Sequence, residues 1–238
     1  MVRGGKKRKA SSQDNSKDTM WPSSGSRNKN KKKATTVTNE SEVERIFCDI
    51  ADPDDPTIAT MEGISKLCDM LSLDIEDIRI LVLLWKMNAV EKPAQITKKE
   101  WLKGCNDLQL DSLDKFKKLL PSLETGFLDR SEYKDFYKYC FQFNRQGTHR
   151  TLDKDLVVAL LQIVLKDRIP QNRLVTFCNF LEKSQYTRIT LDQWTSFLDF
   201  CYECEDISSY DVNNSAWPVL IDEYVEYMEE QDKMPLKK

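Results

Sequence analysis

The fold is decided by a short stretch that occurs twice: residues 96–101 read ITKKEW, and residues 189–194 read ITLDQW. In both copies a threonine stands three positions before Glu or Gln, the capping-box pattern that opens a helix. A β-branched isoleucine precedes each threonine, and a tryptophan follows inside the expected helix. We therefore expect helices to begin after Thr97 and after Thr190.

This layout resembles the EF-hand, in which an apolar residue at loop position 8 pairs in a short strand before the exiting helix. Calcium needs clustered oxygen ligands and a glycine turn, and both are missing here. With Ile96 at position 8, positions 1 and 6 are Ala89 and Ala94. With Ile189 there, positions 1, 6 and 12 are Glu182, Thr187 and Gln193. The sequence predicts EF-hand-like helical pairs without calcium sites.

Helical periodicity continues outward from both stretches. Residues 78–87 are apolar almost all round, which predicts a central buried helix. The other helices are expected over residues 41–50, 61–71, 113–120, 131–143, 152–165, 172–182, 192–204 and 218–230. Only 7 Gly and 8 Pro occur, too few turn formers for a sandwich or barrel of many short strands. The predicted fold class is all-α, in a single compact domain.

Charge divides the chain into unequal parts. Residues 1–40 hold eleven Lys or Arg and three acids, whereas the other 198 residues hold 25 basic and 36 acidic side chains. The first part lacks apolar periodicity, so we expect a disordered tail over 1–40, a folded domain over 41–230 and a flexible C-terminus over 231–238.

Two basic runs in this tail are typical of a nuclear-import signal, and they predict a protein found in the nucleus with some in the cytoplasm. A merely solubilising tail and nonspecific nucleic-acid contact are the less favoured alternatives. The residues of the two runs are Lys6, Lys7, Arg8, Lys9, Lys31, Lys32 and Lys33.

The far end of the chain is acidic. Between Ile189 and Asp232 there are twelve Asp or Glu and no Lys, Arg or His. An ordinary surface mixes signs because like charges repel. Such a stretch predicts a surface that attracts a basic protein partner.

Several functions find no support in the sequence. No apolar run approaches the roughly 20 residues that cross a bilayer, and the chain's start resembles neither a secretory signal nor a myristoylation site. Cys201 and Cys204 form a lone CxxC without a second ligand pair. The other five cysteines fit buried thiols of a reduced compartment: Cys48, Cys68, Cys105, Cys140 and Cys178. Because His149 is the only histidine and no phosphate loop or serine elbow occurs, we expect no catalysis, cofactor or metal.

Residues 207–226 read ISSYDVNNSAWPVLIDEYVE, which resembles the signature of the defective-in-cullin-neddylation (DCN-like) family and its potentiating-neddylation domain. Residues 194–200 (WTSFLDF) and 80–86 (ILVLLWK) are similar to the same family. The resemblance covers about residues 41–230. It implies a non-catalytic ligase component that brings a cullin together with the conjugating enzyme charged with a ubiquitin-like modifier, alongside a RING subunit.

The resemblance also implies two sites. The patch that binds the cullin C-terminal domain falls on Asp199, Ala216 and Asp222, although surface acids and a closely packed alanine would look the same. An apolar cleft would take the acetylated N-terminal methionine of the conjugating enzyme, although plain core residues would give the same pattern. The residues of this cleft would be Met61, Ile80, Leu83, Leu84, Met87, Ile96, Phe143, Leu152, Leu160 and Ile163. One extra residue near Pro93 departs from the family pattern beside this cleft, at residues 92–95.

Two other functions remain as alternatives. One is a calcium-responsive or general protein-binding adaptor, and the other is a nucleic-acid binder that works through residues 1–40. Calorimetry with calcium and deletion of the tail distinguish them from a neddylation accessory.

Overall fold

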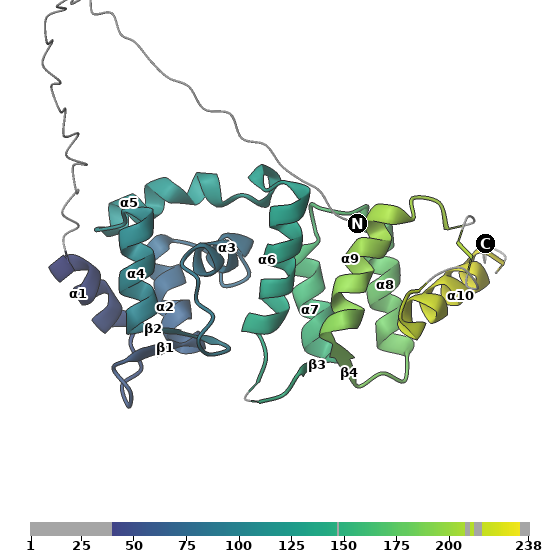
Figure 1. Cartoon of the computed structure of the whole chain (residues 1–238), viewed down its shortest axis with the longest axis horizontal. Helices are drawn as coiled ribbons and strands as arrows, with labels where there is room; N and C mark the ends of the chain where they lie inside the picture. Colours follow the sequence, from purple (N-terminus) through teal and green to yellow (C-terminus); the bar gives the residue numbers. More distant parts are fainter. Residues whose placement is uncertain (1–39, 147, 208–209, 212–215, 234–238) are drawn as a thin grey trace, which may run out of the picture. The chain divides into compact units, whose positions relative to one another are not determined.

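The computed structural model describes residues 40–146, 148–207, 210–211 and 216–233 (Figure 1). Helices dominate, which confirms the expected all-α class, and two small two-stranded sheets join them. The expected tail and its import-like runs lie outside the described residues. Within the described residues, no helix is both long and apolar enough to cross a membrane.

The first half consists of two helix–strand–helix units whose strands pair with each other. Ala59 lies opposite Ile96 in this antiparallel sheet. The elements, in order, are α1 (Glu40–Ile50), β1 (Ile58–Thr60), α2 (Met61–Leu71), α3 (Ile78–Lys86), β2 (Gln95–Thr97) and α4 (Lys98–Leu108).

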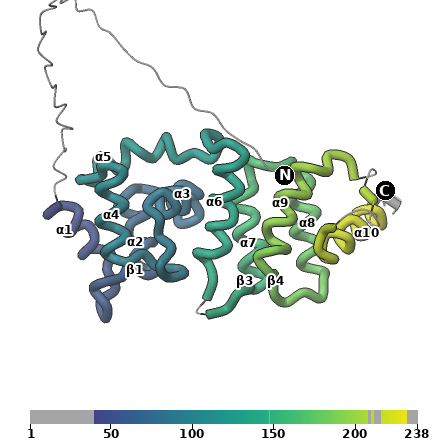
Figure 2. Tube along the Cα trace, viewed as in Figure 1, coloured from purple at the N-terminus to yellow at the C-terminus, as the bar shows by residue number. Residues whose placement is uncertain are grey.

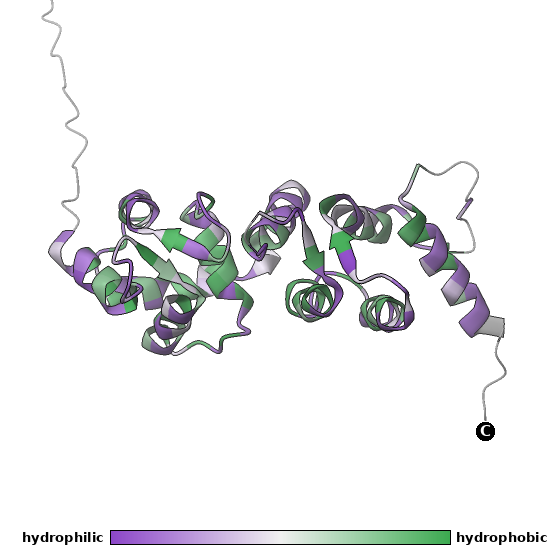
Figure 3. Ribbon diagram, turned by 90° about the horizontal axis from the view of Figure 1, so that it is seen from below, coloured by the Kyte–Doolittle hydropathy of each residue, from purple (hydrophilic) through white to green (hydrophobic). Residues whose placement is uncertain are grey.

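A short connection leads into the second half, which repeats the pattern. Leu152 lies opposite Ile189 in the second antiparallel sheet. Figure 3 shows both strand pairs, coloured largely as apolar, among their helices. The elements are α5 (Leu113–Leu119), η1 (Leu120–Leu123), η2 (Thr125–Phe127), α6 (Arg130–Phe143), β3 (Thr151–Asp153), α7 (Lys154–Val164), α8 (Gln171–Lys183), β4 (Arg188–Thr190), α9 (Leu191–Glu203) and α10 (Val219–Lys233).

The repeated stretch folds as expected. Thr97 caps α4 and Thr190 caps α9, and the side chain of the third helical residue completes the capping box in each. Both tryptophans are buried, Trp101 at 0% and Trp194 at 2% exposure. The indole of Trp101 donates to the carbonyl of Val43 at 3.0 Å, and that of Trp194 donates to the carbonyl of Tyr137 at 2.9 Å. Trp101 therefore ties α4 to α1, and Trp194 ties α9 to α6.

Aromatic stacking surrounds both indoles. Trp101 stacks on Phe116 with ring centres 5.4 Å apart, and Trp194 stacks on Tyr137 at 4.3 Å. Helix α6 contacts α3 on one side and both α7 and α9 on the other, as the chain path in Figure 2 shows. The two halves thus share α6 as a common wall.

Two element boundaries differ from the sequence prediction by more than one residue. The helix expected from residue 152 begins at Lys154, because residues 151–153 pair with β4 instead. Helix α10 runs to Lys233, three residues past the expected domain end at 230.

Candidate functional site

An apolar pocket of about 130 Å³ lies among α2, α3, the end of α6 and α7. Its walls come from helices whose apolar stripes face one another, so the pocket is built on rigid elements. The lining residues are Met61, Ile64, Ile75, Glu76, Asp77, Ile80, Leu81, Leu84, Phe143, Asn144, Leu156, Ala159, Leu160 and Ile163.

Six of the ten residues expected in the cleft line this pocket: Met61, Ile80, Leu84, Phe143, Leu160 and Ile163. Four of these residues are no more than 4% exposed and form the deep walls: Ile80, Leu84, Phe143 and Leu160. Met61 is 42% exposed, and Ile75 beside it is 51% exposed. The pocket therefore opens to solvent at Met61 and Ile75, and its interior is apolar.

The other four expected residues do not line the pocket. Ile96 and Leu152 are the central residues of β2 and β3, and strand pairing turns them into the core. Leu83, on α3, and Met87, directly after its last residue, are 0% and 2% exposed. Met87 packs against Gly104 of α4, where a Cβ would lie only 2.7 Å from the Met87 Cβ. Apolar periodicity identifies buried positions but does not separate a pocket wall from the core behind it.

Sequence reasoning missed the wall that α7 contributes beyond Leu160 and Ile163. Leu156 and Ala159 also line the pocket. Together these positions follow helical spacing along one face of α7, so the periodicity of that helix holds a signal for them. Ala159 is exposed, and its small side chain leaves the pocket open beside it.

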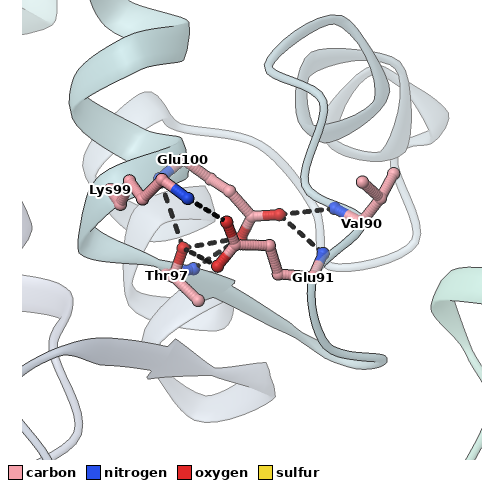
Figure 4. Close-up of polar contacts among 5 residues, drawn as sticks. All are labelled: Val90, Glu91, Thr97, Lys99 and Glu100. Carbon is pink, nitrogen blue, oxygen red and sulfur yellow. Dashed lines mark hydrogen bonds and ion pairs between the residues drawn. The ribbon is translucent and has the colours of Figure 1, made fainter.

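The link between α3 and β2 is fixed beside the pocket by Glu100, a buried residue of α4 (Figure 4). Its carboxylate accepts from the backbone N–H groups of Val90 and Glu91, both at 2.7 Å, and of Thr97 at 2.9 Å. The N–H of Ala94 donates to the carbonyl of Phe143, a pocket residue, at 2.6 Å. The segment around Pro93 is therefore tied to the pocket wall.

The expected cullin-binding residues lie at the other end of the domain, on α9, on α10 and between them. Asp199 of α9 pairs with Lys134 of α6 at 2.6 Å, so it faces the contact between those helices. Asp222 of α10 accepts from the hydroxyl of Tyr210 at 2.5 Å. Ala216 is exposed. The two carboxylates thus have different partners.

Aromatic packing positions the segment around Ala216. The ring of Phe200, on α9, meets Tyr210, Trp217 and Tyr224 edge-on, with ring centres 5.7, 6.2 and 6.1 Å apart. Phe200 follows Asp199 directly in the sequence. The start of α10, with Asp222, is therefore held against α9 by a shared aromatic core.

Basic residues from elsewhere in the chain interleave with the acidic stretch. Arg173 of α8, 9% exposed, donates to the carbonyls of Cys204 at 2.5 Å and Glu205 at 2.9 Å. Lys183 contacts the Tyr227 hydroxyl at 2.9 Å, and Lys134 holds Asp199. One acid of the stretch, Asp199, is thus paired with a cation from a helix that is distant in sequence.

A second hollow, of about 270 Å³, lies between α6 and α9 beside Asp199. It is more polar than the first pocket, and the Lys134–Asp199 pair lies on its wall. The lining residues are Lys134, Asp135, Tyr137, Lys138, Thr195, Leu198 and Asp199.

Four of the five cysteines expected to be buried are buried, but Cys48 is exposed, because it lies off the face of α1 that carries Val43, Ile46 and Phe47. Burial raises the pKa of the Cys201 thiol to about 12, and burial also raises the pKa of Cys204, whereas a reactive thiolate needs a lowered pKa. His149 is exposed in a link between elements. In the part of the chain that the structure describes, no group of three or more His, Cys, Asp or Glu could hold a metal ion.

Comparison with known proteins identifies the family. Residues 115–227 match the family described as Cullin binding. The chain is 37% identical over 182 residues to DCN1-like protein 5 of Homo sapiens. The matched segment covers 76% of this chain and 74% of that protein. It is 34% identical over 183 residues to DCN1-like protein 4 of Drosophila melanogaster, spanning 76% and 72%. With that extent of identity, the chain belongs to the DCN1-like protein family.

Proposed function

We propose that this protein is a non-catalytic accessory of a cullin neddylation ligase. In this role the α9–α10 face binds the C-terminal domain of a cullin, and the apolar pocket holds the acetylated N-terminal methionine of the conjugating enzyme. The RING subunit of the ligase completes the assembly. Holding two reactants on one body raises their effective concentration and fixes their geometry, so the accessory needs no acid or base of its own.

The apolar pocket is the observation that carries this proposal. Its deep walls are buried, its mouth is open at Met61 and Ile75, and its size suits a single apolar side chain. An acetylated terminus is neutral and can enter such a pocket, whereas a free ammonium would lose its hydration there. Met61 adds an adaptable side chain at the mouth.

The fold supports the proposal as a rigid scaffold. In this proposal, both halves are also EF-hand-like helical pairs that carry no calcium. In each half, two helix–loop–helix units meet through paired strands, with Ala59 opposite Ile96 and Leu152 opposite Ile189. Nuclear residence, directed by residues 6–9 and 31–33, is a further part of this proposal and rests on the basic runs alone.

The test is reconstituted cullin modification, with single-turnover rates measured alongside binding. Ala159→Trp fills the pocket from an exposed position, and we expect at least a tenfold weaker affinity, about 1.4 kcal/mol, for an acetylated N-terminal peptide of the conjugating enzyme. Asp155→Trp, at another exposed position of α7, is the matched control and should leave both affinity and rate unchanged.

The cullin face is tested in the same assay by combining Asp199→Ala, Ala216→Arg and Asp222→Ala. We expect cullin affinity and the rate of modifier transfer to fall together. Glu226→Ala with Glu230→Ala removes the same number of acids from exposed positions of α10 and serves as the control. If the triple variant matched this control in both measurements, the proposed cullin face would be wrong.

A further inference from the structure

Lys134 of α6 occupies one of the two acids in the proposed cullin face. Its ammonium lies 2.6 Å from Oδ1 of Asp199 on α9, and the two side chains are 39% and 35% exposed. The ion pair therefore lies at the surface, where a partner protein can reach it. Asp222, the other acid of that face, accepts from the hydroxyl of Tyr210, which is a neutral donor. A basic partner thus meets a counter-ion at Asp199 but a neutral group at Asp222.

The fold sets this pair in place while leaving the ammonium free to move. Lys134 and Asp199 meet because α6 packs on α9, and both line the hollow of about 270 Å³ between these helices. The hollow leaves room beside the pair for a side chain of a partner. Lysine carries its charge on a flexible four-carbon stem. The ammonium can therefore leave Asp199 by rotation of its own side-chain bonds, without a change in either helix.

Lys134 opposes the binding of any further cation to Asp199. If Lys134 stays in place, the arriving cation is repelled by a like charge on the same carboxylate. If Lys134 leaves, the new ion pair replaces an existing one, and the gain is only the difference between the two. A partly exposed ion pair contributes at most about fivefold to an equilibrium constant. Lys134 therefore lowers the affinity of this face by a factor of that order.

We infer that Lys134 is an affinity-determining residue of the cullin face, because in the free protein it takes the place of a lysine or arginine of the cullin, which displaces it from Asp199. This inference rests on the proposed function, which supplies the cullin C-terminal domain as the partner. It extends the face from α9 and α10 onto α6. It also has an unusual sign, since loss of this residue strengthens binding.

The experiment measures the affinity of the full chain for a recombinant cullin C-terminal domain by titration calorimetry at low ionic strength. Lys134→Met removes the charge and keeps an unbranched side chain. The matched control is Lys138→Met, at an exposed lysine one turn later that lines the same hollow. In the part of the chain that the structure describes, Lys138 pairs with no carboxylate, so its loss changes net charge alone. Lys134→Met should bind about twofold to fivefold more tightly than Lys138→Met.

Two further measurements separate displacement from a structural effect of the substitution. The advantage of Lys134→Met should shrink at high ionic strength, because salt screens the ion pair that the control retains. In an Asp199→Asn background the two lysine variants should bind equally, because the carboxylate that Lys134 occupies is gone. Lys134→Gln is the second variant, with the same expected result, and decides the outcome if circular dichroism shows that Lys134→Met is misfolded.

Equal affinities of Lys134→Met and Lys138→Met would overturn the inference, because Lys134 would then act through net charge alone. Weaker binding by Lys134→Met would also overturn it, since Lys134 would then hold Asp199 in place for the cullin. Asp199→Asn alone separates these results from a failure of the proposed function. If it weakens binding, the cullin face stands without the displacement. If it binds like the unchanged protein, the cullin face and the inference are both wrong.

Discussion

Gly63 lies where α2 passes closest to the end of α1. A Cβ at this position would stand 2.0 Å from the carbonyl oxygen of Ile50 and 3.2 Å from the Cβ of Ala59. We expect Gly63→Ala to lower the free energy of unfolding by about 1–3 kcal/mol, because backbone must move to admit the methyl group. Denaturant titration measures this loss.

Gly126→Ala is the control for that substitution, since nothing lies within 4 Å of its Cβ position. It should change stability by about 0.5 kcal/mol at most. Equal stabilities of the two variants would contradict the close approach of α1 and α2.

Single residues also mark the limit of what the sequence could predict. It gives the charge of Asp199 but not the partner, because Lys134 lies 65 positions earlier and meets it only through the packing of α6 on α9. The sequence likewise gives the charge of Arg173 on α8 but not its partners, the carbonyls of Cys204 and Glu205 that follow α9. Charge counted along the chain therefore does not reveal which acids of the α9–α10 region are paired with a cation.

Among the elements, α4 depends on a capping box that is also a loop anchor. Glu100→Ala leaves the N–H groups of Val90, Glu91 and Thr97 without their acceptor. An unsatisfied buried polar group costs roughly 1–3 kcal/mol. We expect a loss of about 3 kcal/mol in unfolding free energy, and faster hydrogen exchange in the α3–β2 link.

The matched control is Glu132→Ala in the capping box of α6, where the residue is exposed. Water replaces the lost acceptor there, so the cost should be about 1 kcal/mol. If both variants lost the same stability, Glu100 would act as a cap only, and its bonds to the link would contribute nothing.

Helices were predictable from the sequence where apolar period and caps coincide, as at Thr97 and Thr190. Strand β3 was not, because three residues are too few for a period, and its pairing partner β4 lies far along the chain. The pocket was predictable in part for a related reason. Periodicity finds the buried face of α3, but only the position of α7 decides that Leu84 borders the opening and Leu83 does not.

At the scale of the whole molecule, the first described element, α1, begins at Glu40, so residues 1–35 supply none of the helices and strands described here. We expect removal of residues 1–35 to leave the melting temperature and cullin affinity unchanged, because the core and both proposed sites lie outside the deleted segment. Calorimetry and a pull-down with a recombinant cullin C-terminal domain check this. A loss of cullin affinity would show that the tail contributes to binding.

The same deletion tests the proposed localisation. In cells, a fluorescent fusion without residues 1–35 should lose its nuclear enrichment, because both basic runs are removed. Replacing only residues 6–9 and 31–33 by alanine should have the same effect and keeps the length of the chain. Unchanged nuclear enrichment in both variants would leave the tail without a role in import.

The two buried indoles give the domain a pair of built-in optical reporters. Trp101 is enclosed by α1, α4 and α5, whereas Trp194 is enclosed by α6 and α9, so each senses water entering a different half. Variants in which one of them is the sole tryptophan, with the other four of the chain's five replaced by Phe, would show whether heating opens both halves in a single step or one before the other, since a wetted indole emits at longer wavelength. Tryptophan fluorescence would thereby show whether the contacts that α6 makes with both halves cause them to unfold together.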